Sequence, residues 1–347
     1  MTSRKTALVV CPGRGTYNKP ELGYLNQHHS GRAPVLSAFE AIRKEAGQPS
    51  LASLDQADTY RVATHTRGDN ASLLIHACAY CDFLDIDRAA YDIVAVTGNS
   101  MGWYTALACA EAVSMEAGAR IVNTMGTFMH EHPVGGQIVY PLVGDDWTQI
   151  AGRRAELMSL LETVNEASGH QAYISIELGG MLVLAGNDAG LNALQEALPV
   201  IDRFPMILSN HSAFHTELQR TNSDRGLSAL GADLFTRPAL PLIDGRGSIW
   251  HGASTAPADL HRYTLDHQVT QMYDFTSAIR VGVHEFAPDC VIVLGPGTTL
   301  GGAVAQSLID IKWRGWATKT DFTRDQSKTP HLISMGRADQ RMLATKV

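Results

Sequence analysis

A serine lies between two glycines in the segment VAVTGNSMGWYTALA, residues 94–108. The apolar run before it predicts a buried strand, and the residues after it predict a helix, so Gly98 to Gly102 would form the sharp strand-to-helix turn of a nucleophile elbow. At a helix N-terminus, backbone N–H groups and the helix dipole favour negative charge on a reacting oxygen. The same five residues also fit a glycine-rich turn in which Ser100 is only structural.

A serine nucleophile needs a base, and the chain has 14 histidines from which to supply one. His211 and His215, in the segment SNHSAFHTEL, follow directly after the last strand of a predicted inserted domain. Clefts form where domains meet. We therefore predict that His215 is the base, with His211 as the next candidate.

Strand and helix patterns alternate along the chain. Buried strands are expected in TALVVCPG, YDIVAVTG and DCVIVLGPG, and helical patterns follow them. Residues 135–208 have the order β-α-β-β-α-β, which is typical of a small ferredoxin-like domain. The sequence therefore predicts an α/β fold in which residues 1–134 and 209–320 form a parallel-sheet domain and residues 135–208 an inserted subdomain. Residues 321–347 are polar and weakly periodic, and they predict a loose C-terminal extension.

Composition excludes several function classes. The 347 residues are 45% hydrophobic and 18% charged with a formal net charge of −7, and no dense basic stripe suits nucleic-acid binding. No apolar stretch approaches the roughly 18 residues of a membrane span, and the N-terminal apolar run is too short for a signal peptide, so a cytoplasmic protein is expected. Cys78 and Cys81 form a C-x-x-C pair within a helical pattern; with no second pair, helix packing is favoured over metal or redox chemistry.

Four blocks in this order, CPGRG, GNSMGWYTALACAEAV, NHSAFHTEL and VLGPGTTL, resemble the malonyl-CoA:acyl-carrier-protein transacylase family and the acyltransferase domains of polyketide and fatty-acid synthases. The resemblance covers roughly residues 5–315 and implies an α/β-hydrolase-like body with a ferredoxin-like insert. It also implies a cytoplasmic, monomeric acyltransferase of polyketide or fatty-acid biosynthesis that binds no metal or cofactor. The donor would be an acyl-CoA or an acyl carrier protein, and the acceptor the phosphopantetheine thiol of a carrier protein.

The resemblance implies a role for each matching residue. Ser100 would attack the acyl thioester with His215 as general base, and the carrier thiol would then take the acyl group from the acyl-serine. The oxyanion hole would consist of the backbone N–H groups of Met101 and Arg14. Backbone carbonyls orient the histidine in this family, so we nominate no catalytic aspartate.

The sequence departs from the family pattern beside the nucleophile and in residues 12–15, PGRG, which we call the oxyanion loop. Asn99 stands where the family has a histidine, Trp103 where it has an acidic residue, and Arg14 where it has a glutamine. The glutamine-proline pair that begins a later helix is replaced by Asn70-Ala71, and Asn70 is also a candidate N-cap. These positions are candidates for substrate contacts.

Met125 stands where malonyl-using members carry the arginine that pairs with the malonyl carboxylate. A thioether cannot supply the charge of a guanidinium, so Met125 predicts an acyl group without a free carboxylate. Phe128, Met129 and Phe214 are further candidates for the same pocket. Three alternatives remain: a malonyl transacylase whose carboxylate site is rearranged around Arg14, an acyl-thioester hydrolase on the same two residues, and a non-catalytic carrier-binding protein.

Overall fold

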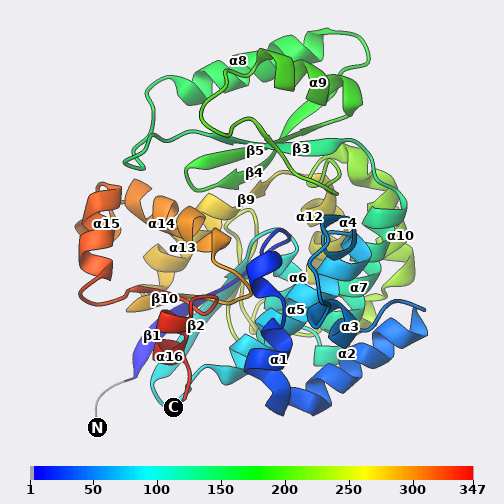
Figure 1. The fold of residues 1–347 in the computed structure, drawn as a ribbon, viewed down its shortest axis with the longest axis vertical. Helices are drawn as coiled ribbons and strands as arrows, with labels where there is room; N and C mark the ends of the chain where they lie inside the picture. Colours follow the sequence, from blue (N-terminus) through cyan, green and yellow to red (C-terminus); the bar gives the residue numbers. More distant parts are fainter. Residues whose placement is uncertain (1–3, 347) are drawn as a thin grey trace.

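The computed structural model describes residues 4–346, which form two sheets, one above the other in Figure 1. The larger sheet has the strand order β11-β10-β1-β2-β7-β8. All neighbouring strands in it are parallel except β7 and β8, which are antiparallel. The strands of this sheet are β1 (Lys5–Cys11), β2 (Tyr91–Gly98), β7 (Leu242–Ile243), β8 (Ile249–Trp250), β10 (Cys290–Val293) and β11 (Leu332–Ser334).

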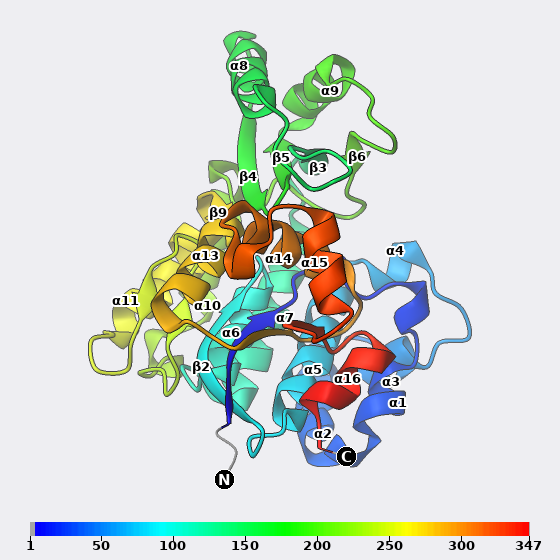
Figure 2. The ribbon, with the colours of Figure 1, turned by 90° about the vertical axis from the view of Figure 1, so that its left-hand side faces the viewer.

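Helices cover both faces of the larger sheet, with α5 and α6 on one face and α13 on the other (Figure 2). Strands buried on both faces lack the polar alternation of a half-exposed strand, and residues 7–11 of β1 are accordingly all apolar and fully buried. The helices of this part are α1 (Tyr24–His29), α2 (Ala33–Glu45), α3 (Leu51–Asp55), α4 (Val62–His65), α5 (Gly68–Asp85), α6 (Gly102–Cys109), α7 (Met115–Glu131), α10 (Arg220–Ala229), α11 (Pro257–Arg262), α12 (Gln268–Thr270), α13 (Phe275–Phe286), α14 (Thr299–Asp310), α15 (Lys319–Gln326) and α16 (Ala338–Ala344).

The smaller sheet has the strand order β6-β3-β5-β4-β9. Its first four strands and two helices follow the chain order β-α-β-β-α-β, and α8 and α9 cover its outer face (Figures 1 and 2). The predicted ferredoxin-like unit on an α/β-hydrolase-like body is therefore confirmed as the fold. Its elements are β3 (Gly136–Pro141), α8 (Arg153–Glu166), β4 (Ala172–Leu178), β5 (Met181–Gly186), α9 (Asp188–Ala197) and β6 (Met206–Ile207).

One strand from outside the inserted segment completes the smaller sheet. β9 (Tyr273–Asp274) leads into α13 of the large part and pairs in parallel with β4. The side chain of Tyr273 reaches back to the larger sheet, where its hydroxyl donates a hydrogen bond of 2.5 Å to the carbonyl of Gly98. The two sheets are thus joined at Gly98, the first residue of the predicted nucleophile elbow.

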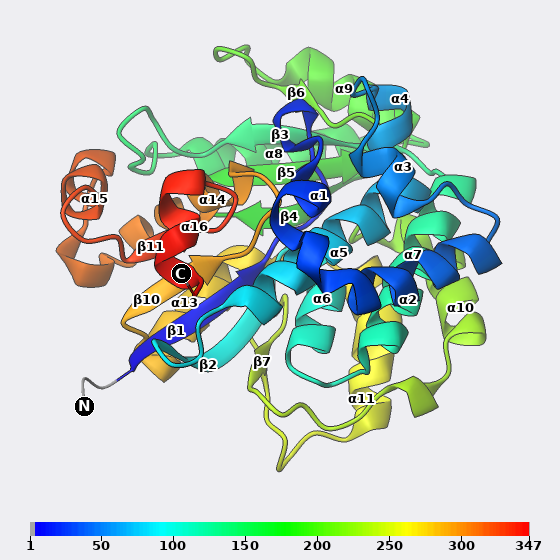
Figure 3. The ribbon, with the colours of Figure 1, turned by 60° about the horizontal axis from the view of Figure 1, so that its bottom comes forward.

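The prediction of a loose C-terminal extension is wrong. β11 adds to the edge of the larger sheet by pairing with β10 (Figure 3), and side-chain hydrogen bonds link α16 to α1 and α5. Arg341 of α16 is buried and donates hydrogen bonds to the Asp82 carboxylate, at 2.5 Å, and to the Tyr24 hydroxyl, at 2.9 Å. Polar composition misled the prediction because the buried strand β11 is only three residues long and α16 is held largely by ionic contacts of Arg341, so the segment shows little hydrophobic periodicity.

No helix within residues 4–346 combines the length and apolar character that a membrane span requires.

Candidate active site

Ser100 occupies a strained turn between the end of β2 and the start of α6. Its φ of 54° lies in the left-handed region that non-glycine residues rarely adopt. The turn is close to other backbone: a Cβ on Gly98 would collide with the main chain of Gly102, and one on Gly102 would collide with the carbonyl of Cys11 at the end of β1. Both glycines are therefore required by the close packing, as a nucleophile elbow needs.

The structure brings Ser100 and His215 together across 115 residues of chain. Ser100 Oγ lies 2.7 Å from His215 Nε2, and His215 Nδ1 lies 2.6 Å from the main-chain carbonyl of Gln268. A carbonyl can only accept, so Nδ1 carries the ring proton and Nε2 accepts from the Ser100 hydroxyl. This is the arrangement in which an imidazole can take a proton from a serine.

Residues of the smaller sheet and of the segment before it hold the two residues that precede His215. Ser175 of β4 donates a hydrogen bond to the carbonyl of Phe214, and the N–H of Ala213 donates to Val134 before β3. His215 has a φ of 57° and is buried. The residue thus lies at the junction between the two parts of the chain, where the sequence analysis expected a cleft.

Gln268 is a site residue that the sequence analysis missed. Besides its carbonyl contact with His215, its side-chain amide donates to the carbonyl of Ser100 at 3.1 Å and accepts from the Tyr104 hydroxyl at 3.1 Å. It follows a π-helical turn at Tyr263–His267, an irregularity that often occurs at functional sites. No motif in the sequence marks this turn, so only the structure could find Gln268.

Burial lowers the pKa of His215 to about 4, although its hydrogen bond to the Gln268 carbonyl acts in the opposite direction. The ring is therefore neutral at neutral pH and can accept a proton. His211, the alternative base, lies elsewhere: its Nδ1 is 2.8 Å from Gln137 Oε1, and its side chain lines the cleft between the two sheets. The geometry therefore favours His215 over His211 as the base for Ser100.

The backbone N–H groups of Met101 and Arg14 are the candidates for an oxyanion hole. Met101 is the residue after Ser100, and Arg14 follows the end of β1, the strand next to β2. Within the described part of the chain, neither N–H donates to a protein acceptor. Both residues line the cavity beside Ser100, so these donors are free to bind a carbonyl oxygen there.

A small cavity opens beside Ser100. Its volume is about 30 Å³, and roughly 10–15 Å³ on this measure holds one water molecule. The cavity therefore suits a chemical group of a few atoms. Its lining comes from α5, α6, α7, the oxyanion loop and the segments that carry His215 and Gln268: Arg14, Ser72, Ser100, Met101, Tyr104, Gly126, Met129, Phe214, His215, Gln268 and Val269.

Met125 is not part of this lining, which corrects the predicted contact with the acyl group. Its side chain is fully buried and faces α10, where a Cβ added to Gly226 would lie 2.7 Å from its sulfur. The next residue, Gly126, lines the cavity instead, together with Met129 one turn later. Phe128 also faces away, under the guanidinium of Arg225 at 3.9 Å.

Three other predicted substrate contacts are also outside the cavity. Trp103 is fully buried, with its indole N–H donating to Thr264 at 3.0 Å. Asn99 is buried with its main chain packed against Gly13. Asn70, which lies inside the first turn of α5 rather than at its N-cap, accepts from Arg43 and donates to the carbonyl of Thr64. At these three positions the side chains that differ from the family pattern are buried within the protein and do not line the cavity.

Arg14 and Phe214 do line the cavity, as predicted. The Arg14 guanidinium stacks over the Phe214 ring at 5.4 Å and donates to the carbonyls of Thr66, at 2.6 Å, and Asn210, at 2.8 Å. Burial lowers its pKa to about 10, with the charge of Asp69 acting in the opposite direction. Arg14 also lines a larger cleft of about 710 Å³ between the two sheets, so it stands at the boundary between cavity and cleft.

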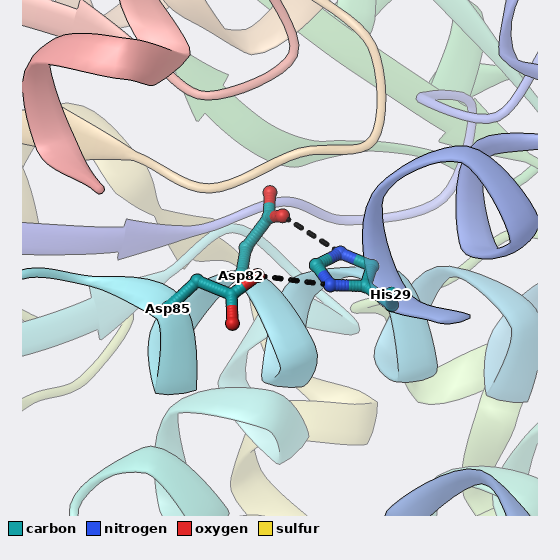
Figure 4. Close-up of side chains that lie close together, drawn as sticks. All are labelled: His29, Asp82 and Asp85. Carbon is teal, nitrogen blue, oxygen red and sulfur yellow. Dashed lines mark hydrogen bonds and ion pairs between the residues drawn. The ribbon is translucent and has the colours of Figure 1, made fainter. Parts of the chain in front are cut away.

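The described residues also contain one group of side chains with metal-ligand chemistry, His29, Asp82 and Asp85 (Figure 4). His29 lies 3.0 Å from each carboxylate through its two ring nitrogens, and Arg341 binds both carboxylates. Although burial opposes it, hydrogen bonding to the two carboxylates raises the pKa of His29 overall. A guanidinium and an imidazole already fill the ligand positions, so this group fits an ionic anchor for α16 better than a metal site.

No model of a known protein family matches the chain, and no curated protein is similar to it in sequence. Solved structures are similar in fold. The malonyl-CoA:acyl carrier protein transacylase of Xanthomonas oryzae superposes with a TM-score of 0.73 at 18% identity, over 99% of this chain and 98% of that one. The acyl carrier protein S-malonyltransferase of Vibrio cholerae gives 0.71 at 19%, over 97% and 98%. A malonyl-transacylase in complex with a type II polyketide synthase acyl-carrier protein gives 0.71 at 17%, over 98% and 99%.

The chain has the malonyl-CoA:acyl carrier protein transacylase fold. At identities below one fifth, this likeness concerns the fold over nearly the whole chain, and function has to be argued from the site itself.

Proposed function

We propose that the protein is an acyltransferase of fatty-acid or polyketide biosynthesis that moves an acyl group from a thioester to the phosphopantetheine thiol of a carrier protein. The observation that carries the proposal is the 2.7 Å contact between the strained Ser100 and a neutral His215. The Ser100 oxygen attacks the thioester carbonyl while His215 Nε2 takes its proton. His215 then returns that proton to the departing thiolate, which leaves as a thiol, and the acyl group stays on Ser100 as an acyl-serine.

The second half-reaction uses the same groups in reverse. The carrier thiol gives its proton to His215 and attacks the acyl-serine, and Ser100 regains its hydroxyl. In both steps the N–H groups of Met101 and Arg14 stabilise the oxyanion. The cleft of about 710 Å³ next to Arg14 gives a phosphopantetheine arm a path to Ser100. No step requires a metal or a bound cofactor, and the partners proposed are an acyl-CoA or acyl-carrier donor and a carrier acceptor.

For the acyl group we propose a short chain without a free carboxylate. Among the described side chains that line the cavity, Arg14 is the one cation. Two hydrogen bonds from Arg14 go to main-chain carbonyls. The alternative remains a carboxylated acyl group whose charge is met by Arg14, and malonyl thioester is the probe for it.

A thioester hydrolase would use the same acyl-serine, so the test follows the fate of the acyl group. The protein is incubated with radiolabelled acetyl-, butyryl- and malonyl-CoA, freed of excess donor, and mixed with holo acyl carrier protein. We expect label on Ser100 that persists in buffer and moves to the carrier within seconds. Rapid loss of label to water, unchanged by the carrier, would indicate a hydrolase. Absence of label from all three donors and from an acyl-carrier donor would contradict the proposal.

A further inference from the structure

The cavity beside Ser100 contains a buried hydroxyl that nothing in the protein binds. Ser72 of α5 is 1% exposed and lines the cavity, and within residues 4–346 its Oγ has no hydrogen-bond partner. Leaving a buried hydroxyl unpaired costs stability, and alanine at this helical position would avoid that cost. The hydroxyl is therefore poorly explained as a structural group.

Most other polar side chains of the cavity already make hydrogen bonds within the protein. The Tyr104 hydroxyl donates to Gln268, the Gln268 amide donates to Ser100, and Ser100 and His215 bind each other. Arg14 has a buried Nε without a partner, but this residue stands at the boundary with the larger cleft. Among the described residues, Ser72 is thus the polar side chain without a hydrogen-bond partner on the side of the cavity formed by α5 and α7.

The Ser72 hydroxyl lies at the contact between α5 and α7, and Ser72 and Gly126 both line the cavity there. Gly126 of α7 lies directly opposite, and a Cβ at Gly126 would collide with Ser72 Oγ. Around the hydroxyl the cavity is largely apolar, with Met101, Met129 and Val269 in its lining. A hydrogen bond made there is shielded from water, so it can discriminate between acyl groups.

We propose that Ser72 is a specificity-determining residue that hydrogen-bonds a neutral oxygen, hydroxyl or oxo, on the acyl chain. This inference rests on the proposed acyl-serine chemistry and names its substrate class as short oxygenated acyl thioesters. A hydroxyl can donate to an oxo group or exchange hydrogen bonds with a hydroxyl. A carboxylate at the same place would meet no cation on the α5 and α7 side, and its charge would be unpaired. A plain hydrocarbon chain would leave the Ser72 hydroxyl unpaired.

The test compares rates of Ser100 acylation by four-carbon thioesters that differ at one atom. Butyryl-CoA, 3-hydroxybutyryl-CoA and acetoacetyl-CoA are used with the unaltered protein, Ser72→Ala and Ser307→Ala. Ser307 is a matched control because it is equally buried but donates to the carbonyl of Ala303 within α14. We expect the unaltered protein and Ser307→Ala to prefer an oxygenated chain over butyryl by about tenfold, and Ser72→Ala to lose this preference.

Melting temperatures and a parallel assay with malonyl-CoA distinguish the proposal from a structural role of Ser72 and from recognition by Arg14. A structural Ser72 would lower the melting temperature when replaced, whereas the proposal expects no loss. Equal rates for butyryl and oxygenated chains in the unaltered protein would overturn the inference while leaving acyl transfer intact. Use of malonyl-CoA alone, unchanged in Ser72→Ala, would assign recognition to Arg14 and also overturn it. If no thioester acylates Ser100, equal binding of butyryl- and 3-hydroxybutyryl-pantetheine by calorimetry would reject the inference independently.

Discussion

Replacing His215 with alanine is expected to slow the acylation of Ser100 by about 100- to 10,000-fold, the usual contribution of a general base. Nε2 of this ring lies 2.7 Å from the nucleophile, and its tautomer is fixed by the Gln268 carbonyl. Without the ring, the Ser100 hydroxyl keeps its proton at neutral pH and attacks slowly. Rapid-quench acylation with an acyl-CoA that labels the unaltered protein measures the effect.

Two controls accompany this variant. His261→Ala removes a histidine that contacts the Leu230 carbonyl away from the cavity, and it should acylate at the normal rate. The pH profile gives a second readout: the neutral ring is the active form, so the rate should hold as pH falls through 6.5 and decline only as pH approaches about 4. Near-normal acylation in His215→Ala, together with a large loss in His211→Ala, would transfer the role of base to His211.

Replacing Gly102 with alanine is expected to reduce acylation by at least about 100-fold, because displacements near 1 Å cost this much in a positioned site. The added Cβ would collide with the Cys11 carbonyl and lie 2.8 Å from that of Pro12. Both contacts are backbone, so the elbow has to move away from the oxyanion loop. Overpacking of this kind also costs about 1–3 kcal/mol of stability.

Gly301→Ala is the matched control, since Gly301 lies within α14 and an added Cβ meets no atom within 4 Å. It should melt at or above the temperature of the unaltered protein and keep full activity. Acylation is measured well below the melting temperature of each variant, so that lost geometry is separated from lost fold. Full activity in folded Gly102→Ala would show that the tight approach of the elbow to β1 is not required.

The elements of the central fold could be predicted from sequence because their signals are local. β1 and β2 each contain a continuous apolar run, the elbow has glycines at the two positions where backbone meets backbone, and the order of residues 135–208 follows a known small motif. Buried parallel strands and tight turns leave such marks in composition. The C-terminal segment leaves only a weak mark, because its buried strand has three residues and ionic contacts of Arg341 hold its helix.

The site was only partly predictable for a similar reason. Ser100 and His215 lie in recognisable blocks, whereas Gln268 acts largely through its main-chain carbonyl, which any residue could supply. Met125 shows that alignment with a family position does not establish what a side chain contacts. Its neighbour Gly126 lines the cavity, whereas the Met125 thioether packs against α10. Which residues of a helix point into a cavity depends on how the helix is rotated against its neighbours. A rotation equivalent to one residue therefore changes which side chains line a small cavity.

The most direct test of the account is the mass of the intact protein after incubation with acetyl-, butyryl-, 3-hydroxybutyryl- and malonyl-CoA. The account predicts an added acyl mass that peptide mapping assigns to Ser100 and that Ser100→Ala abolishes. An added mass that persists in Ser100→Ala, or none from these thioesters or from an acyl-carrier donor, would contradict the role of Ser100 as an acyl-accepting nucleophile.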